Sequence, residues 1–275
     1  MKGIGTRALT GFFITGIILA CVYFSPVSFI ILFLLISVFA AQEFLSHTVD
    51  KEYLFLRTGI STLCGLIPGA SLAFYLSQED DSYVILSISA FLLGLILIFI
   101  LELFLKSKRP MENIAFSLMS IIYTGIFISS VFYIGFKDGQ YESYLIIGIL
   151  VITWANDSFA YLFGSAFGRT KLFERISPNK TWEGTLGGIF MALVFSFIAF
   201  KLIGIYSVTS WLIFGAIISI IGTLGDLVES MFKRSLQIKD SGSIFPGHGG
   251  VLDRFDSIML HLPILAAYII LRSNF

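Results

Sequence analysis

The chain has 275 residues, of which 56% are hydrophobic and 13% are charged. Soluble domains carry about 25% charged residues. This composition and a mean hydropathy of +0.90 therefore exclude an ordinary soluble protein and indicate an integral membrane protein. The 18 basic residues balance the 18 acidic residues, so the net charge identifies no partner, and we expect no nucleic acid. The positions of the charges are more informative.

Long apolar runs predict membrane-spanning helices, because the hydrocarbon core needs about 20 apolar residues per helix. The runs are continuous rather than alternating, so transmembrane strands are not expected. The first run resembles a signal peptide, but no A-x-A cleavage site follows it, and we predict a retained span. The predicted fold is all-α and polytopic, with about nine transmembrane helices at 8–24, 27–45, 58–76, 83–105, 114–136, 143–166, 184–206, 209–231 and 257–272.

The basic residues in the connections predict the orientation, because cytoplasmic loops are enriched in Lys and Arg. With the N-terminus in the cytoplasm, all Lys and Arg residues except Lys137, Lys201 and Arg272 fall on the cytoplasmic side. Eight or ten spans would move Arg272 to that side as well, which is a weak objection to nine spans. We still predict nine spans, with the N-terminus inside.

The polar residues are shared unevenly along the chain. Residues 1–140 are predicted to form about five plain spans with short loops. Residues 141–275 are predicted to form about four spans and the two long cytoplasmic connections, at about 167–183 and 232–256. No period of 20–50 residues repeats. We expect one membrane domain, with its chemistry in the second part.

One helix face near the end of the eighth span carries Asp226, Glu229, Ser230 and Lys233 at positions i, i+3, i+4 and i+7. Asp226 would lie about 10 Å deeper than Lys233 along the axis. An acid at mid-membrane costs about 2.5–3.5 kcal/mol, so it needs a partner. That partner is a cation, a metal or water. Alternatively, Glu229 and Lys233 form a structural pair, and Asp226 bonds to a neighbouring helix.

The loop that follows contains Lys239 and the stretch Pro246–Gly250, whose glycines allow backbone N–H groups to approach an anion. Asp253 and Asp256 lie three residues apart at a predicted helix N-terminus, where acids can also serve the helix dipole. A hairpin of this length can return Asp253 to Asp226. Two such carboxylates would repel without a cation, and Mg²⁺ typically takes one or two carboxylates. We therefore predict a metal site held by Asp226 and Asp253.

A second polar group precedes these acids. Asn156 and Asp157 lie inside an apolar span, where interhelical hydrogen bonding is the alternative to a site. Ser177 could cap a turn, and Lys180 with Thr181 could face a phosphate. This is no Walker A loop, since G-x-x-x-x-G-K-[ST] is absent. The nearby basic residues could equally serve orientation or anionic lipid.

Three segments, 230–234, 239–242 and 248–256, closely resemble the signature of the phosphatidate cytidylyltransferases, also called CDP-diacylglycerol synthases. The segments 157–161 and 177–184 also resemble that family, although Asn179 stands where a lysine is frequent. The resemblance covers roughly residues 150–257. The first half resembles the family only as a set of membrane spans.

The resemblance implies that CTP and phosphatidic acid give CDP-diacylglycerol and pyrophosphate, and that bacterial members lie in the inner membrane. It also implies a divalent metal, Mg²⁺, held by acids at the positions of Asp226 and Asp253, with a second cation near it. The active site would be cytoplasmic, and a homo-oligomer is left open.

We assign roles to the matched residues as hypotheses. Asp256 and Asp157 support the two metal ligands. Gly249 and Gly250 leave room for the backbone to approach a phosphate. His248 contacts a phosphate or is structural, because an ionised phosphate nucleophile needs no general base. Asn156, Ser177 and Thr181 are further candidates for substrate binding. The cations expected to neutralise phosphates are Lys180, Lys233, Arg234, Lys239 and Arg254.

Two other functions stay open. A CTP-dependent polyprenol or lipid kinase also meets a nucleotide and a bilayer lipid, but it would release a phosphorylated lipid and CDP. An ion or solute transporter could line a path with Asp157 and Asp226, although the polar residues gather on one side of the membrane. The D-G-x-x-A-R motif of the alcohol phosphotransferases is absent.

Overall fold

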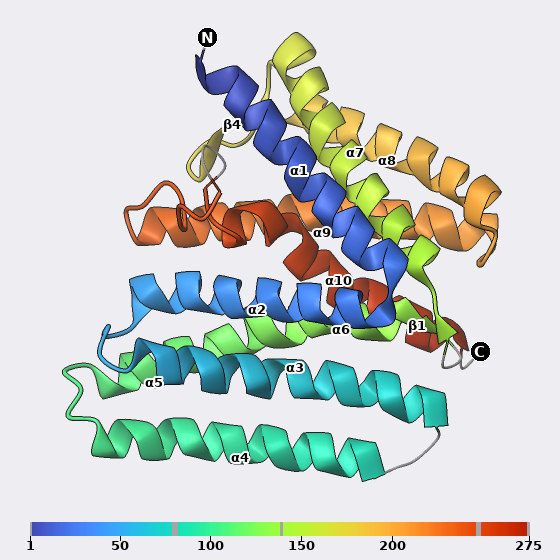
Figure 1. Ribbon diagram of the computed structural model, residues 1–275. Helices are drawn as coiled ribbons and strands as arrows, with labels where there is room; N and C mark the ends of the chain where they lie inside the picture. The colour runs from blue at the N-terminus through green and yellow to red at the C-terminus, as the bar shows by residue number, and fades with distance from the viewer. Residues whose placement is uncertain (1, 79–81, 138–139, 246–248, 274–275) are drawn as a thin grey trace. The chain divides into compact units, whose positions relative to one another are not determined.

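The computed structural model describes residues 2–78, 82–137, 140–245 and 249–273. The fold is all-α and polytopic, as predicted, and a helical segment lies at each predicted span (Figure 1). The helices are α1 (Lys2–Phe24), α2 (Pro26–Thr48), α3 (Leu54–Gln78), α4 (Ser82–Phe104), α5 (Pro110–Ser120), the π-helical η1 (Ile121–Ile126), α6 (Phe127–Gly135), α7 (Ser143–Phe167), α8 (Trp182–Ile203), α9 (Val208–Ser235) and α10 (Leu252–Ser273).

Two short antiparallel hairpins lie in the connections, where the sequence predicts no strands. Strand β1 (Phe136–Lys137) pairs with β2 (Gln140–Tyr141), and β3 (Lys171–Phe173) pairs with β4 (Ser177–Thr181). The second hairpin fills the first long connection and carries Lys180.

Seven helical segments in the described part of the chain are long and apolar enough to cross a membrane. They are α2, α4, the continuous α5–η1–α6 segment and α7 to α10. The apolar stretches found in α1 and α3, Gly11–Phe24 and Leu54–Pro68, are shorter. The membrane character is thus confirmed, and the total of nine crossings stays a prediction.

The helix boundaries follow from local chemistry. Ser25 caps α2 by accepting a hydrogen bond from the Val27 N–H, and Pro26 takes the first helical position, where its missing N–H is harmless. Thr181 caps α8 through the Gly184 N–H. Gly204 ends α8 with a φ of 72°, a left-handed conformation that glycine adopts without strain.

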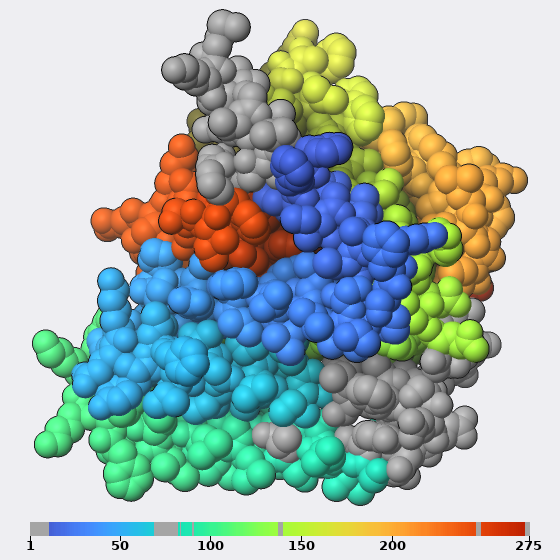
Figure 2. Space-filling model, viewed as in Figure 1, coloured from blue at the N-terminus to red at the C-terminus, as the bar shows by residue number. Residues whose placement is uncertain are grey.

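The chain divides into two compact units. The first unit comprises Met1–Glu142 and Asp240–Arg254. Within it, α3 packs against α2, α4 and η1, and α2 and α3 form neighbouring blue and cyan bands in Figure 2. Gly65 of α3 faces Gly125 of η1, and a Cβ atom on either would lie closer than 3.0 Å to the other backbone. Small residues thus let these two helices approach closely.

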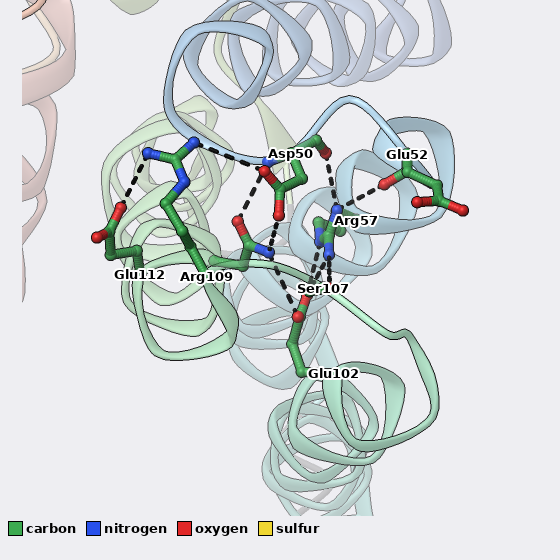
Figure 3. A network of polar contacts seen from close by, with 8 residues as sticks. Asp50, Glu52, Arg57, Glu102, Ser107, Arg109 and Glu112 are labelled. Atoms are coloured by element: carbon green, nitrogen blue, oxygen red, sulfur yellow. Dashed lines mark hydrogen bonds and ion pairs between the residues drawn. The ribbon is translucent and has the colours of Figure 1, made fainter.

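A polar network ties α3, α4 and α5 together in the first unit (Figure 3). Arg57 is only 1% exposed and forms a buried ion pair with Glu102. Its Nη1 donates to the carbonyl oxygens of Asp50 and Glu52 at 2.9 and 2.6 Å. Asn113 donates to Asp50 and to Glu102. The sequence assigns Arg57 to a loop as an orientation charge, but α3 begins earlier and buries it.

The second unit comprises Ser143–Lys239 and Phe255–Phe275. Within it, α7 packs along α8, and α9 packs against both. Glycines of α8 allow this close approach, because a Cβ on Gly184 or Gly188 would meet the backbone oxygen of Ala160 or Asn156 at 2.6 or 2.9 Å. Gly225 of α9 likewise lies against the backbone at Asp256 of α10. These contacts hold α7 close to α8, and α9 close to the start of α10.

Candidate functional site

A group of charged side chains, here called the carboxylate cluster, lies in the second unit. Lys180 of β4 places its Nζ 2.6 Å from Oδ2 of Asp226 on α9. Ser230, one turn along α9, donates to Oδ1 of Asp226 at 3.3 Å. The deep acid of the eighth predicted span therefore has a cation as a partner, as its insertion cost requires. The cluster comprises Asn156, Asp157, Lys180, Asp226 and Asp256.

Three acids from three helices meet in this cluster. The carboxyl groups of Asp157, Asp226 and Asp256 are close enough to interact electrostatically. Asn156 donates to Oδ1 of Asp157 at 3.1 Å. The backbone N–H of Ser257 donates to Oδ1 of Asp256 at 2.7 Å. Three carboxyl groups share a single lysine here, and hard oxygen donors of this kind suit Mg²⁺.

Lys233 has a different partner. Its Nζ lies 2.5 Å from Oε2 of Glu229, and the Glu229 side chain is fully buried. This is the structural pair that the sequence leaves open as an alternative. The pair shares the helix with Asp226, and Glu229 also interacts electrostatically with Asp256.

The loop Asp240–Arg254, here called the signature loop, belongs to the first unit. It folds around Oδ2 of Asp253, which accepts from the Ser241 N–H at 2.8 Å, the Ser241 hydroxyl at 3.0 Å and the Gly250 N–H at 2.8 Å. Gly249 has a φ of 80°, and a Cβ there would lie 2.5 Å from Oδ2 of Asp253. The glycines therefore let the backbone wrap closely around this carboxylate.

The sequence reasoning missed Glu43, which lies in a predicted plain span. Glu43 of α2 is 7% exposed and accepts hydrogen bonds from the signature loop at Val251, Leu252 and Ser241. An ionisable residue inside an apolar run is by itself a signal of function. That signal was available in the sequence.

The remaining candidates lie at the edges of these groups. Thr181 is buried as the cap of α8, and Ser177 is half-buried in β4. Arg234, Lys239 and Arg254 are exposed. His248 lies outside the described residues. Asp226 and Asp253 belong to different units, so their shared metal site stays a prediction.

The residues present fit a magnesium site that the substrate completes. Within the described residues, no three His, Cys, Asp or Glu side chains form a group that could hold a metal by themselves. Mg²⁺ usually binds through one or two carboxylates, together with waters and substrate phosphates. The carboxyl oxygens of Asp226 and its neighbours in the cluster are donors of that kind, and the metal itself stays a prediction.

The chain is similar to curated proteins named phosphatidate cytidylyltransferase. It is 44% identical over 162 residues to those of Staphylococcus aureus (strain COL) and Staphylococcus haemolyticus (strain JCSC1435), covering 58% of this chain and 60% of each relative. It is 37% identical over 171 residues to that of Haemophilus influenzae, covering 59% of this chain and 58% of that relative.

The chain thus spans about 60% of the length of the curated relatives that it matches. The model of the cytidylyltransferase family matches nearly the whole chain, at residues 5–272. The match includes both the carboxylate cluster and the signature loop. On this evidence, the chain belongs to the cytidylyltransferase family.

Proposed function

We propose that this protein is a phosphatidate cytidylyltransferase, which converts CTP and phosphatidic acid to CDP-diacylglycerol and pyrophosphate. Its family membership and the names of the curated proteins that it resembles support this assignment. The observation that carries it is the carboxylate cluster, in which three acids and a lysine meet between apolar helices. We place the chemistry in residues 141–275, which include the signature loop.

The reaction is an in-line displacement at phosphorus. An oxygen of the phosphatidate phosphate attacks the α-phosphorus of CTP, a new P–O bond forms, and the bond to the β-phosphate oxygen breaks. The electron pair leaves with pyrophosphate. The phosphatidate phosphate is already ionised, so the enzyme needs no dedicated general base. The main task of the protein is positioning and charge neutralisation.

Repulsion between the two anionic substrates is the barrier that the cations address. Mg²⁺, held by Asp226 and Asp253, would supply charge neutralisation at the phosphoryl oxygens when bound. Lys180 exchanges its contact with Asp226 for a phosphate oxygen. Asp157 and Asp256 supply further carboxyl oxygens beside Asp226 and support the metal ligands. The exposed residues Arg234, Lys239 and Arg254 meet the outgoing phosphates.

The membrane setting fits a lipid substrate. Large apolar side chains on α4 and α8, such as Leu93 and Phe190, are exposed and suited to lipid. The tails of phosphatidic acid stay in the bilayer, while its headgroup meets CTP at the surface. From the Lys and Arg distribution, we place the N-terminus and the site on the cytoplasmic side of a bacterial inner membrane.

The decisive experiment uses purified protein in detergent micelles with phosphatidic acid, Mg²⁺ and each of the four nucleoside triphosphates. We expect pyrophosphate and a CDP-lipid with CTP alone, and no turnover after chelation of the metal. Release of CDP with a phosphorylated lipid would instead show a lipid kinase. Ion or solute flux into vesicles without CTP would show a transporter. Either result would overturn the proposal.

A further inference from the structure

Glu43 is a buried acid that the proposed reaction does not use. It lies on α2, nearly 200 residues before the signature loop, but within the same compact unit. Its Oε1 accepts the Val251 N–H at 2.9 Å. Its Oε2 accepts the Leu252 N–H at 2.9 Å and the Ser241 hydroxyl at 3.0 Å. One carboxylate thus binds both the beginning and the end of the loop.

A second side chain of α2 contacts the same loop. The Nε2 of His47 lies 2.9 Å from the carbonyl oxygen of Ser241, and it must donate there because a carbonyl only accepts. Glu43 and His47 are four residues apart, so they share one face of the helix. The face of α2 that meets the loop therefore carries two polar anchors, both directed at Ser241.

The shape of the loop is matched to Glu43. A Cβ atom on Gly242 or Gly250 would lie closer than 3.0 Å to the Glu43 carboxylate, a separation that real Cβ atoms essentially never show. Neither glycine needs an unusual backbone angle, since the positive φ in the described part of the loop belongs to Gly249. At Gly242 and Gly250, the missing side chain is therefore explained by the space that Glu43 takes.

Ser241 links Glu43 to Asp253. Its hydroxyl lies 3.0 Å from Oε2 of Glu43 and 3.0 Å from Oδ2 of Asp253. A hydroxyl has one proton and can donate to one carboxylate at a time. Donation to Glu43 leaves Asp253 held by the backbone N–H groups of Ser241 and Gly250. The position of Asp253 therefore depends on Glu43 through Ser241.

We propose that Glu43 is a positioning residue, which holds the signature loop so that Asp253 is kept in place for its role as a metal ligand. This inference rests on the proposed function, because it gives Asp253 a role in phosphate chemistry. Glu43 touches the loop and acts through Ser241 and Asp253. The alternative is a purely structural role, in which Glu43 caps α10 by accepting hydrogen bonds from its first N–H groups and stabilises the fold.

The first test replaces Glu43 with glutamine, which keeps the size but puts an NH₂ group against one of the N–H donors. Losing a charge-assisted hydrogen bond should speed amide exchange in residues 241–252 about tenfold or more. The β3–β4 hairpin of the second unit is the internal control and should exchange as before. In the turnover assay, the Mg²⁺ concentration for half-maximal rate should rise severalfold.

The outcomes separate the two ideas. Faster loop exchange with an unchanged Mg²⁺ dependence would leave Glu43 as a structural cap and would overturn the inference, while the proposed function stands. Unchanged exchange of the loop would also overturn it. If wild-type protein makes no CDP-lipid, the proposed function fails, and the exchange measurement still decides whether Glu43 holds the loop.

The second test uses the fit between Glu43 and Gly250. Gly250→Ala should disturb the loop in the wild-type protein, because the methyl group meets the Glu43 carboxylate. In a Glu43→Ala background that neighbour is gone, so Gly250→Ala should add little further exchange. Gly249→Ala is the matched control, because its strain comes from a φ of 80° and from Asp253.

Gly249→Ala should therefore raise amide exchange in the loop by the same factor in the wild-type protein and in the Glu43→Ala variant. Additive effects for Gly250→Ala, as for Gly249→Ala, would show that Glu43 does not shape the loop. If Glu43→Ala fails to fold, Glu43→Asp replaces it as the background. Its side chain is one methylene shorter, so Gly250→Ala should again add less exchange than it does in the wild-type protein, while Gly249→Ala should not.

Discussion

The ammonium group of Lys180 lies 2.6 Å from a carboxylate oxygen of Asp226, which joins the β3–β4 hairpin to α9. The two side chains are 25% and 36% exposed. Partly exposed pairs of this kind contribute about 0–1 kcal/mol to stability. The pair should therefore add little to stability, and we expect its role to be the placement of a cationic side chain within the carboxylate cluster.

Replacing Lys180 with methionine should thus separate activity from stability. We expect a change in unfolding free energy of under about 1 kcal/mol and a loss of roughly 100-fold in CTP turnover, as for other groups that stabilise transition-state charge. Lys171→Met is the matched control on the same hairpin, since its Nζ donates to the Pro178 carbonyl. Equal losses of activity in the two variants would contradict a specific role for Lys180.

The metal assignment predicts that Asp226→Asn and Asp253→Asn each abolish turnover while the protein still inserts and folds. Removing one charge from a site that needs a cation leaves the phosphates repelling each other. Glu112→Gln, a surface change in α5, serves as the control. Activity is followed by pyrophosphate release, and folding by size-exclusion chromatography in detergent. Near-normal activity in both variants would remove the metal assignment.

Local features of the fold could be predicted from the sequence because their causes are local. A helix must cross the hydrocarbon core, so the length and apolarity of each run predict its span. Ser25 and Pro26 mark a break because their backbone chemistry favours a helix start. Asp226, Ser230 and Lys233 share a face through helical periodicity alone.

The polar partners could not be predicted in this way, because they come from distant segments. Lys180 meets Asp226, and Glu43 meets Val251, across long stretches of chain. Helical spacing predicts which residues share a face of one helix. It does not predict which other segment that face contacts. Arg57 illustrates a different error. The distribution of basic residues places it in a cytoplasmic loop, whereas in the structure it lies in α3 and is buried against Glu102. A carboxylate in an apolar run remains the most useful warning of such contacts.

Lys233 should contribute to the stability of the folded protein as well as to the charge of the site. Lys233→Ala removes the cation beside the buried Glu229 carboxylate, and breaking a buried pair costs about 3–5 kcal/mol. Lys233→Arg keeps the charge and should cost far less in both melting temperature and turnover. The double variant Lys233→Met with Glu229→Gln should recover stability but not activity. Equal losses for Lys233→Arg and Lys233→Ala would mean that geometry rather than charge governs this position.

The Arg57–Glu102 pair should act on stability alone. Arg57→Ala leaves Glu102 buried without its cation, so we expect a loss of about 3–5 kcal/mol in unfolding free energy. Arg109→Ala is the control, because Arg109 is an exposed member of the same network (Figure 3). Thermal melting in detergent measures both. The turnover rate of Arg57→Ala protein that remains folded should be unchanged, and a selective loss of turnover would assign Arg57 to the site.

The same network predicts a pH dependence outside the spans. The hydrogen bond from Asn113, helped by the charge of Arg109, lowers the pKa of Asp50 below its ordinary value of 3.8. A lowered pKa in the folded state means that Asp50 contributes stability above about pH 4, which is lost as the pH falls through the folded pKa. The melting temperature of the wild-type protein should therefore exceed that of Asp50→Asn near neutral pH, and the difference should shrink below pH 4. Asn113→Ala should reduce the difference at neutral pH, because it removes the main cause of the shift. A difference that stays constant from pH 7 to pH 3 would show that Asp50 stabilises the network by shape rather than by charge.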